Sequence, residues 1–331
     1  MIIKTYAYPR AALIGNPSDG YFGKTIAFTF SNFRAMATLY ETPELVIEPG
    51  PRDGSTFASI EDLSADVRKY GYYGGIRLIK SAIKCFHDYA AQNGITLHNR
   101  NFTLRYESNI PNLVGLAGSS AIITACMRAI TAFYGVTIPK ARLANLVRDV
   151  ENVELGIAAG LQDRVAQAYQ GLVYMDFDKA LLETRGYGEY RELSKDLMPP
   201  LYIAYRTDLS EGSEVFHNNI RDRFNNGDKT VVDAMAFWAA LTDKALAAME
   251  KKDYAELSKL MDANFDMRAR LYKLSEGNLR MVQAAREAGA SAKFSGSGGA
   301  IVGVCPDEAT YAKLQASLSA LNVQVLRPVL V

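Results

Sequence analysis

The sequence predicts an α+β fold with an antiparallel sheet, and three observations indicate it. Short apolar runs separated by Gly, Pro, Asn and Asp open the chain, and such runs are typical of strands. Long segments with apolar residues at three- and four-residue spacing follow, and that spacing is typical of helices. In the second half, strand-like runs stand at both ends of the helical segments, which indicates an antiparallel sheet in an α+β domain.

The first half of the chain is expected to begin with short strands. They are the runs IIKTYAY, AALIG, TIAFTF, AMATLY and ELVIEP, between residues 2 and 49. From residue 72 to 93 the apolar residues recur at helical spacing, and Gly94 supplies a stop. The remaining elements of this half are a strand at 102–107, helices at 119–134, 139–155 and 163–169, and a strand at 171–177.

The second half of the chain is expected to be mainly helical. Strands are predicted at 201–206 and 323–330, and the glycine-rich run AKFSGSGGAIVGV lies between them. The predicted helices lie at 212–225, 230–250, 254–272, 276–288 and 307–318. The segment 185–200 carries Gly, Pro and mixed charge, so we place a domain boundary there and divide the chain into domains 1–190 and 191–331.

Composition and charge exclude several classes of protein. The 331 residues carry a formal net charge of +1 without a basic block, whereas nucleic-acid binding depends on concentrated positive charge. No apolar run approaches the ~20 residues that span a bilayer, and the N-terminus lacks the apolar core of a secretory signal. The three cysteines are far apart, so we expect buried thiols in a reducing compartment. These features predict a cytoplasmic protein that binds neither nucleic acid nor membrane. The sequence does not fix its oligomeric state, and a monomer and a homodimer both stay open.

A glycine-rich turn before a predicted helix is the first candidate site. In the stretch PNLVGLAGSSA, Gly115 and Gly118 precede two serines, and small residues let the backbone come close to a ligand. The first N–H groups of the following helix lack partners within the helix and carry partial positive charge. The turn therefore suits an anion such as phosphate. Simple capping of the helix by Ser119 or Ser120 is the alternative that this segment alone leaves open.

Two other uses of such a turn fit the sequence poorly. A hydrolase nucleophile requires the pattern G-x-S-x-G and a partner histidine, but the second glycine is missing and no histidine lies in a suitable context. The common nucleotide-binding loop G-x-x-x-x-G-K-[ST] requires a lysine after its last glycine, and none follows Gly118. A phosphate site of another kind therefore has to be considered.

Three segments of the chain resemble, in order, the motifs of the GHMP kinases, the family of galactokinase, homoserine kinase, mevalonate kinase and phosphomevalonate kinase. The stretch from Pro111 to Ala121 resembles the phosphate loop, in the longer form of the branch that holds the heptose kinases and glucuronokinases. YPRAALIGNPSDGYFGKTI resembles the N-terminal motif, and AKFSGSGGAIVGV resembles the third, glycine-rich motif. One glycine-rich turn is a weak signal, but three matches spaced over the whole chain are a strong one.

The resemblance implies a fold and an activity. The fold is a two-domain GHMP kinase, with an N-terminal domain like ribosomal protein S5 domain 2 and a C-terminal ferredoxin-like domain. The activity is transfer of the γ-phosphate of ATP, with Mg²⁺, to a hydroxyl of a small sugar or sugar acid. D-glucuronate, converted to its 1-phosphate, is the first choice of acceptor. A heptose 7-phosphate, another C1 sugar hydroxyl and a mevalonate-type acceptor stay open, as do a non-catalytic sensor and a decarboxylase on the same fold.

The resemblance also implies the residues that act on ATP and on the acceptor hydroxyl. The ATP phosphates would lie against Gly115, Leu116, Ala117, Gly118, Ser119, Ser120 and Ala121. Asp163 would be the catalytic aspartate that accepts the acceptor's proton or orients its hydroxyl. Arg10 would lie beside it, lowering the pKa of the aspartate and neutralising transferred charge. Helix capping is the alternative role of Asp163 when the resemblance is set aside.

Ligands for the metal and the substrate are implied in the same way. Ser120 and Glu151 would hold Mg²⁺, with Glu154 as a close rival to Glu151. Both glutamates could instead face water on an exposed helix. The substrate would be held by Asp19, Asn16, Arg164 and Gly298. The nucleotide base is placed near residues 72–79 without support for any single residue.

A uronate acceptor adds one requirement, because its carboxylate needs an arginine guanidinium as partner. Arg164 neighbours the proposed catalytic aspartate, and Arg268 and Arg270 lie in the run NFDMRARLY. Each of the three is equally consistent with a surface charge. The sequence therefore leaves the choice among them open.

Overall fold

A computed structural model describes residues 1–50, 53, 57–70, 74–207 and 220–331, and the contacts within the chain group into two compact units. The first unit is formed by residues 1–7, 33–109 and 119–159, and the second by residues 8–32, 110–118 and 160–331. The chain thus passes from one unit to the other several times. These units are defined by contacts, and their boundaries differ from those of the predicted domains 1–190 and 191–331. The division into these two domains stays a prediction.

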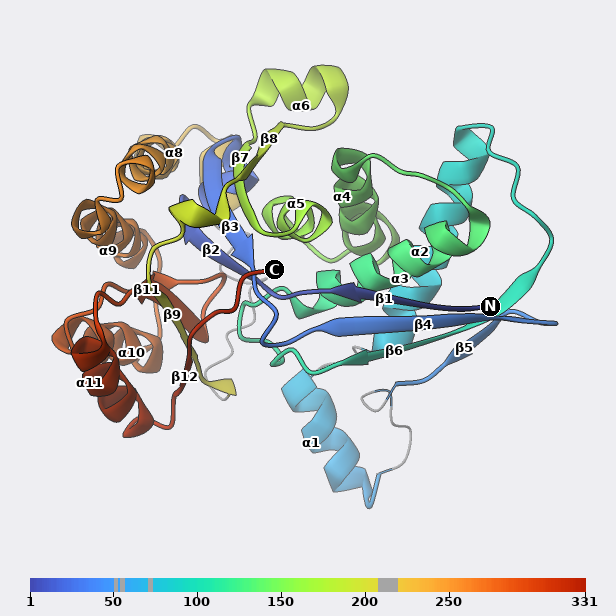
Figure 1. Ribbon diagram of the computed structural model, residues 1–331, viewed down its shortest axis with the longest axis horizontal. Coiled ribbons are helices and arrows are strands. Elements are labelled where there is room, and N and C mark those ends of the chain that lie inside the picture. Colours follow the sequence, from blue (N-terminus) through green and yellow to red (C-terminus); the bar gives the residue numbers. More distant parts are fainter. Residues whose placement is uncertain (51–52, 54–56, 71–73, 208–219) are drawn as a thin grey trace. The chain divides into compact units, whose positions relative to one another are not determined.

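The first unit contains a four-stranded sheet with helices on both sides. Its strand order is β1 (Ile2–Ala7), β4 (Ala35–Thr42), β6 (Asn101–Ser108) and β5 (Val46–Glu48). Neighbouring strands pair antiparallel, except that β5 runs parallel to β6. The helices are α1 (Ile60–Tyr70), α2 (Gly75–Gln92), α3 (Gly118–Tyr134) and α4 (Lys140–Asp149). Helices α2, α3 and α4 lie on one side of this sheet and α1 on the other (Figure 1).

Helix α3 is the element that the glycine-rich turn leads into. It confirms the helix predicted at 119–134, and most of its residues are buried. Apolar residues on nearly all of its sides fit a helix enclosed by other elements. Helix α4 continues into a π-helical turn, η2 (Val150–Glu154), so the helix predicted at 139–155 is confirmed as well. The proposed base region 72–79 lies partly outside the described residues.

The second unit contains two four-stranded antiparallel sheets. The first has the order β2 (Arg10–Ile14), β3 (Lys24–Thr29), β7 (Leu172–Asp176) and β8 (Glu189–Leu193). Helices α8 (Lys229–Glu250) and α5 (Gln162–Tyr169) lie on opposite sides of it (Figure 1). Burial from both sides explains why nearly all residues of β2 and β3 are buried, with apolar residues next to one another rather than alternating with exposed ones.

The other sheet of the second unit confirms the antiparallel sheet that the sequence predicted. Its order is β10 (Lys293–Phe294), β11 (Ala300–Val304), β9 (Leu201–Tyr205) and β12 (Gln324–Leu326). It packs with α9 (Tyr254–Leu271), α10 (Glu276–Glu287) and α11 (Glu308–Ser319). Their shared core is apolar and includes Tyr202, Phe265, Met281, Phe294 and Leu314.

Several short elements were not predicted from the sequence. They are α1, β8, α6 (Lys179–Arg185), and the 3₁₀ turns η1 (Ser18–Tyr21) and η3 (Lys195–Leu197). Strand β8 lies within the segment 185–200 that we took for a boundary. Its sequence EYREL has no apolar alternation and none of its residues is buried, so the strand pattern is missing. It is held by pairing along its backbone with β7.

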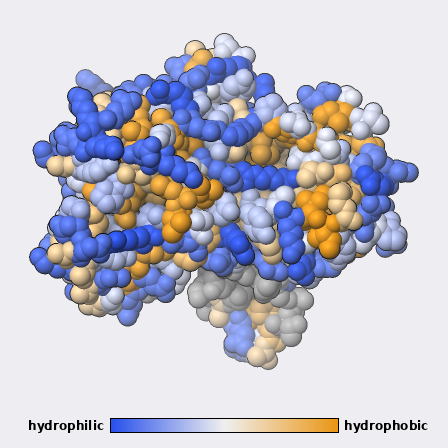
Figure 2. All heavy atoms as spheres, viewed as in Figure 1, coloured by the Kyte–Doolittle hydropathy of each residue, from blue (hydrophilic) through white to orange (hydrophobic). Residues whose placement is uncertain are grey.

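The surface, the helices and the cysteines can be compared with the composition. Apolar residues form separate patches among hydrophilic ones on the face shown in Figure 2. Over the described parts of the chain, none of the helices combines the length and the apolar character that a bilayer span requires. Cys85, Cys126 and Cys305 are free and buried, as predicted.

Candidate active site

Arg10 joins three segments of the second unit that lie far apart in the sequence. Its side chain is buried, and its Nε donates a hydrogen bond to Asp163 Oδ1 over 2.8 Å. Its Nη2 contacts the same carboxylate oxygen. Its Nη1 donates to the carbonyl oxygens of Gly115, over 3.0 Å, and Ser295, over 2.7 Å. The guanidinium therefore connects the glycine-rich turn, the predicted catalytic aspartate and the third motif.

The backbone at the start of β2 explains this position of Arg10. The Arg10 N–H donates to Leu116 O over 3.1 Å, and the Ala12 N–H donates to Ser295 O over 2.9 Å. The strand is thus bonded to the glycine-rich turn and to the third motif. Ser295 was not predicted as a site residue, although it lies in the run AKFSGSGG that carried the third motif.

Asp163 lies in the first turn of α5 as an ionised carboxylate. Burial alone would raise its pKa, but the guanidinium charges of Arg10 and Arg164 outweigh burial and hold the pKa of Asp163 below its usual range. Arg164 Nη1 lies 3.4 Å from Asp163 Oδ2 and also donates to Gly160 O over 3.1 Å. At neutral pH the Asp163 carboxylate can therefore accept a hydrogen bond from a substrate hydroxyl.

Asp19 is a second carboxyl group close to Asp163. Burial and the charge of Asp163 raise the pKa of Asp19 to about 7, although Arg10 and Arg164 act in the opposite direction. A Cβ placed on Gly160 would lie 2.8 Å from Asp19 Oδ2, so this carboxyl packs against the backbone just before α5. Two neighbouring carboxyl groups with separated pKa values are typical of sites that handle protons or hydroxyl groups.

Asn16 adds an uncharged hydrogen-bond acceptor in the loop between β2 and β3, which also carries Asp19. The side chain is buried, and within the described residues its Oδ1 has no hydrogen-bond partner. Its backbone carbonyl accepts a hydrogen bond from Asn264 Nδ2 over 3.0 Å, which holds the loop in place. A buried acceptor without a donor is costly, and a ligand hydroxyl would satisfy it.

The glycine-rich turn has a backbone suited to an anion. Gly115 and Ala117 both adopt left-handed conformations, with φ of 69° and 61°. Helix α3 begins at Gly118, so the N–H groups that follow the turn are the first of a helix. Gln167, which was not predicted, donates from Nε2 to Ala117 O over 2.8 Å and fixes the turn from α5. Left-handed residues ahead of a helix N-terminus form a concave set of donors for phosphate.

The third motif packs directly on this turn and explains its glycines. A Cβ on Gly115 would lie 3.0 Å from both Gly298 O and Ser297 N, and a Cβ on Gly296 would overlap Gly115 O. The two turns are therefore in backbone contact, which side chains would prevent. The Gly299 N–H donates to Asn278 Oδ1 over 3.0 Å.

In the first unit, Glu151 forms a hydrogen bond with a serine of α3. Ser119 Oγ donates to Glu151 Oε1 over 2.8 Å, and the Glu151 side chain is 2% exposed. Glu154, the rival for a metal, is instead bonded to Lys84 over 2.8 Å. The sequence analysis chose Ser120 as the serine ligand, and that choice stays a prediction. Ser119, the neighbouring serine, was not chosen, although its hydroxyl donates to Glu151.

These two oxygens fit Mg²⁺, which takes oxygen ligands and in kinases uses one or two carboxylates together with substrate phosphates. Over the part of the chain that the structure describes, no group of three or more His, Cys, Asp or Glu side chains is arranged to hold a metal. A site of Glu151, a serine hydroxyl and ligand phosphate is compatible with that finding.

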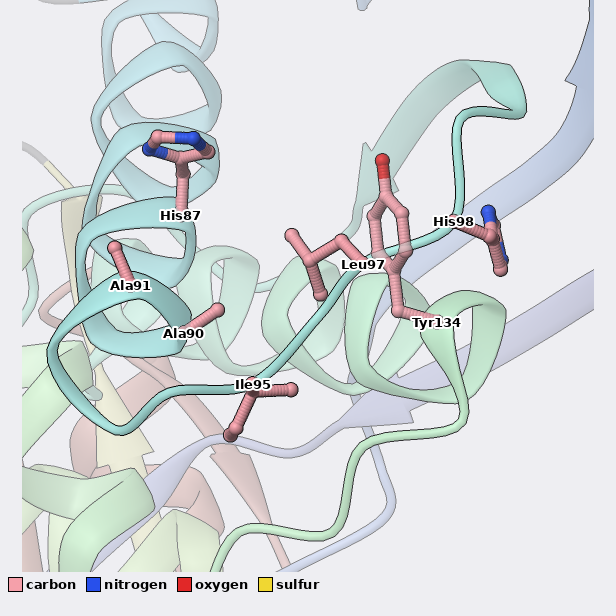
Figure 3. A pocket seen from close by; sticks show the side chains of 7 residues that line it. All are labelled: His87, Ala90, Ala91, Ile95, Leu97, His98 and Tyr134. Carbon is pink, nitrogen blue, oxygen red and sulfur yellow. The ribbon is translucent and has the colours of Figure 1, made fainter.

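A separate pocket of about 300 Å³ lies in the first unit (Figure 3). It is lined by His87, Ala90, Ala91, Ile95, Leu97, His98 and Tyr134. The side chains of Leu97 and Tyr134 lie next to each other at its centre, and His87 projects from α2 (Figure 3). No carboxylate and no glycine-rich turn lines it, so we place no catalytic step there.

Comparisons with known proteins find two matching family models and two similar proteins. The family models GHMP kinases N terminal domain and GHMP kinases C terminal match residues 77–171 and 245–324. Probable glucuronokinase 2 of Arabidopsis thaliana is 44% identical over 93% of this chain and 86% of that protein. Glucuronokinase 1 of the same plant is 41% identical over 94% of this chain and 87% of that protein.

A solved structure extends the comparison to the fold. The structure of Streptococcus pneumoniae phosphomevalonate kinase covers 100% of both chains with a TM-score of 0.76 and 14% identity. At that identity the likeness shows the fold alone.

Proposed function

Because the chain belongs to the GHMP kinase family, we propose that it transfers the γ-phosphate of ATP to the 1-hydroxyl of D-glucuronate, forming D-glucuronate 1-phosphate and ADP. The chain is an ATP-dependent sugar kinase, and the identity of its acceptor is the proposal. One observation carries the assignment of the reacting centre. Arg10 brings the Asp163 carboxylate, the glycine-rich turn and the third motif together within one unit.

Asp163 is proposed to act on the acceptor. Phosphoryl transfer depends mainly on positioning and charge neutralisation, so an ionised carboxylate that accepts a hydrogen bond from the 1-hydroxyl would direct that oxygen toward phosphorus. Arg10 keeps the carboxylate ionised and stays bonded to it, so that its positive charge remains beside the transferred group. Arg164 and Gly298 are still proposed to help hold the sugar substrate, as the resemblance implied.

The backbone from Gly115 to Ser120 is proposed to bind the ATP phosphates. The left-handed turn and the first N–H groups of α3 supply donors and partial positive charge. Mg²⁺, when bound, neutralises charge on the phosphate oxygens. Glu151 and the Ser119 hydroxyl would hold it, and Ser119 follows the turn directly in the chain.

The raised pKa of Asp19 predicts a pH dependence. If Asp19 accepts hydrogen bonds from sugar hydroxyls, its ionised form binds the sugar, and that form is lost as the pH falls through about 7. We therefore expect kcat/KM for D-glucuronate to rise with pH and level off above that value. In Asp19→Asn the plateau should drop by about tenfold or more and the rise should disappear. A rise near the same pH that persists in Asp19→Asn would show that another group, the nucleotide included, is responsible.

The choice of acceptor is tested by measuring ADP release with Mg²⁺ and ATP. The panel contains D-glucuronate, D-galactose, a heptose 7-phosphate and mevalonate. The proposal predicts rapid ADP release with D-glucuronate and a phosphorus NMR signal of a sugar 1-phosphate. Preference for another acceptor would reject D-glucuronate and keep the kinase. Saturable binding of sugar without ADP release would indicate a sensor, and ADP release with loss of carbon dioxide would indicate a decarboxylase.

A further inference from the structure

The structure narrows the choice of arginine for the carboxylate of a sugar acid. Arg164 is engaged with Gly160 O and the Asp163 carboxylate. The buried Arg268 donates to Gly296 O over 3.0 Å and to Ser297 O over 3.3 Å, so its guanidinium supports the third motif. Arg270 is exposed near the end of α9. Arg164 and Arg268 therefore use Nη atoms in contacts within the protein, although their Nε atoms have no hydrogen-bond partner among the described residues. The loop between β2 and β3 that carries Asp19, here called the Asp19 loop, has a further arginine beside it.

Arg221, which the sequence analysis did not consider, lies against that loop. Its Nη2 is 3.1 Å from the position that a Cβ on Gly20 would take. Its guanidinium carbon lies 4.9 Å from the ring centroid of Tyr21, in a cation–π contact. The Tyr21 ring is supported in turn by the ring of Phe224, at 5.0 Å between centroids. Arg221 is thus held beside the residues that directly follow Asp19.

Among the described residues, the guanidinium of Arg221 has neither an ion pair nor a hydrogen bond. Arg223, two residues further on, differs, because its Nε is bonded to Asp228 Oδ2 over 2.8 Å. A cation–π contact uses the face of the guanidinium and leaves its N–H donors directed outward in the plane. Those donors match the two oxygens of a carboxylate.

Tyr272 supplies a second, independent observation at the same place. The residue is 8% exposed, and its hydroxyl has no hydrogen-bond partner among the described residues. The guanidinium carbon of Arg268 lies 5.2 Å from the ring centroid of Tyr272. Burial raises the pKa of Tyr272, and the charges of Arg268, Asp19 and Arg221 also act on it. A buried hydroxyl without an acceptor is costly, and a ligand oxygen would satisfy it.

Resting on the proposed function, we propose that Arg221 binds the carboxylate of the sugar acid, with the Tyr272 hydroxyl as a second donor, and so selects a uronate over a neutral sugar. Asp19 cannot serve this purpose, since a carboxylate would repel it. The division of roles follows from charge. Asp19 and Asn16 accept from sugar hydroxyls, whereas Arg221 and Tyr272 donate to the carboxylate. Arg221 is thus a specificity-determining residue that takes no part in phosphoryl transfer.

The test compares Arg221→Gln with the unaltered protein on D-glucuronate and on D-glucose, which lacks the carboxylate. The substrate carboxylate is not a reacting group, so its contact with Arg221 should stabilise the bound substrate and the transition state equally. Loss of that contact should therefore raise KM with little change in kcat. We expect kcat/KM for D-glucuronate to fall by about 10- to 100-fold, while the value for D-glucose stays within about twofold. Arg221→Lys should recover part of the loss, because lysine keeps the charge without the paired donors.

Arg270→Gln serves as the matched control and should leave kcat/KM for both sugars unchanged. Equal losses on D-glucuronate and D-glucose in Arg221→Gln, or no loss on either, would overturn the inference while the kinase assignment stands. A selective loss in Arg270→Gln instead would move the carboxylate site there. An unaltered protein that does not turn over D-glucuronate would reject the proposed acceptor itself. If D-glucose turns over too slowly to measure, calorimetry compares the affinity of the unaltered protein and of Arg221→Gln for D-glucuronate. The inference predicts weaker binding in Arg221→Gln, and an unchanged affinity would overturn it.

Discussion

Asp163→Asn is expected to lower kcat by roughly 10²- to 10⁴-fold, which is the usual contribution of a positioned acid–base group. Asparagine keeps the shape and one acceptor oxygen of the side chain, but it loses the charge that Arg10 and Arg164 maintain. The acceptor hydroxyl would then be neither deprotonated nor oriented by a carboxylate. The measurement is kcat at saturating ATP and D-glucuronate, together with the thermal unfolding midpoint of the variant.

Asp233→Asn is the matched control for this variant. Asp233 is an exposed residue of α8, so the same chemical change should leave both kcat and the unfolding midpoint unaltered. A well-folded Asp163→Asn protein with nearly normal turnover would remove Asp163 from the mechanism. A protein that fails to fold would instead assign this carboxylate a structural role at the start of α5.

Arg10→Gln is expected to affect both stability and the pH profile. Removing Arg10 from this mostly buried ion pair leaves Asp163 with only the more distant Arg164 as a cationic partner, and we expect the free energy of unfolding to fall by about 3–5 kcal/mol. The bonds to Gly115 O and Ser295 O would weaken as well. The expected loss in kcat/KM is therefore larger than that of a single catalytic contact, since the glycine-rich turn loses support.

The pH profile separates the electrostatic role of Arg10 from its structural role. Arg10 lowers the pKa of Asp163, whereas burial raises it, so without Arg10 the pKa of Asp163 increases. Asp163 would then ionise only at a higher pH, and the acidic limb of kcat should move upward. Arg280→Gln, an exposed arginine of α10, should leave the limb in place. An unchanged limb in a folded Arg10→Gln protein would contradict the coupling of these two side chains.

The sequence named candidate site residues that the structure brings together, but it did not predict the contacts between them. Gly115, Asp163 and Arg10 were identified through motifs, because each carries a residue type that its local pattern demands. That Arg10 bonds to both other segments depends on how β2 pairs with the turn and with Ser295, which no local pattern encodes. That the Ser119 hydroxyl donates to Glu151 depends on the rotation of α3 about its axis, which the sequence does not encode.

Arg221 and β8 show where sequence reasoning failed for physical reasons. Arg221 is identified only by its contact with Tyr21, two hundred residues earlier in the chain, and its own segment carries no motif. Strand β8 is stabilised by backbone bonds to β7 and has no buried side chain, so its apolar pattern is absent. By contrast, α3 was predicted nearly to its ends, since a turn signal and a long apolar run coincide there.

The central claim is that the turn from Gly115 to Ser120 holds the ATP phosphates and that Asp163 holds the acceptor hydroxyl. The most direct test is a crystal structure of the protein with a non-hydrolysable ATP analogue and D-glucuronate. The account predicts the β- and γ-phosphates within hydrogen-bond distance of the backbone N–H groups that follow Gly115, and the 1-hydroxyl on the Asp163 carboxylate. A nucleotide bound elsewhere, with that turn and carboxylate both without ligand, would contradict it.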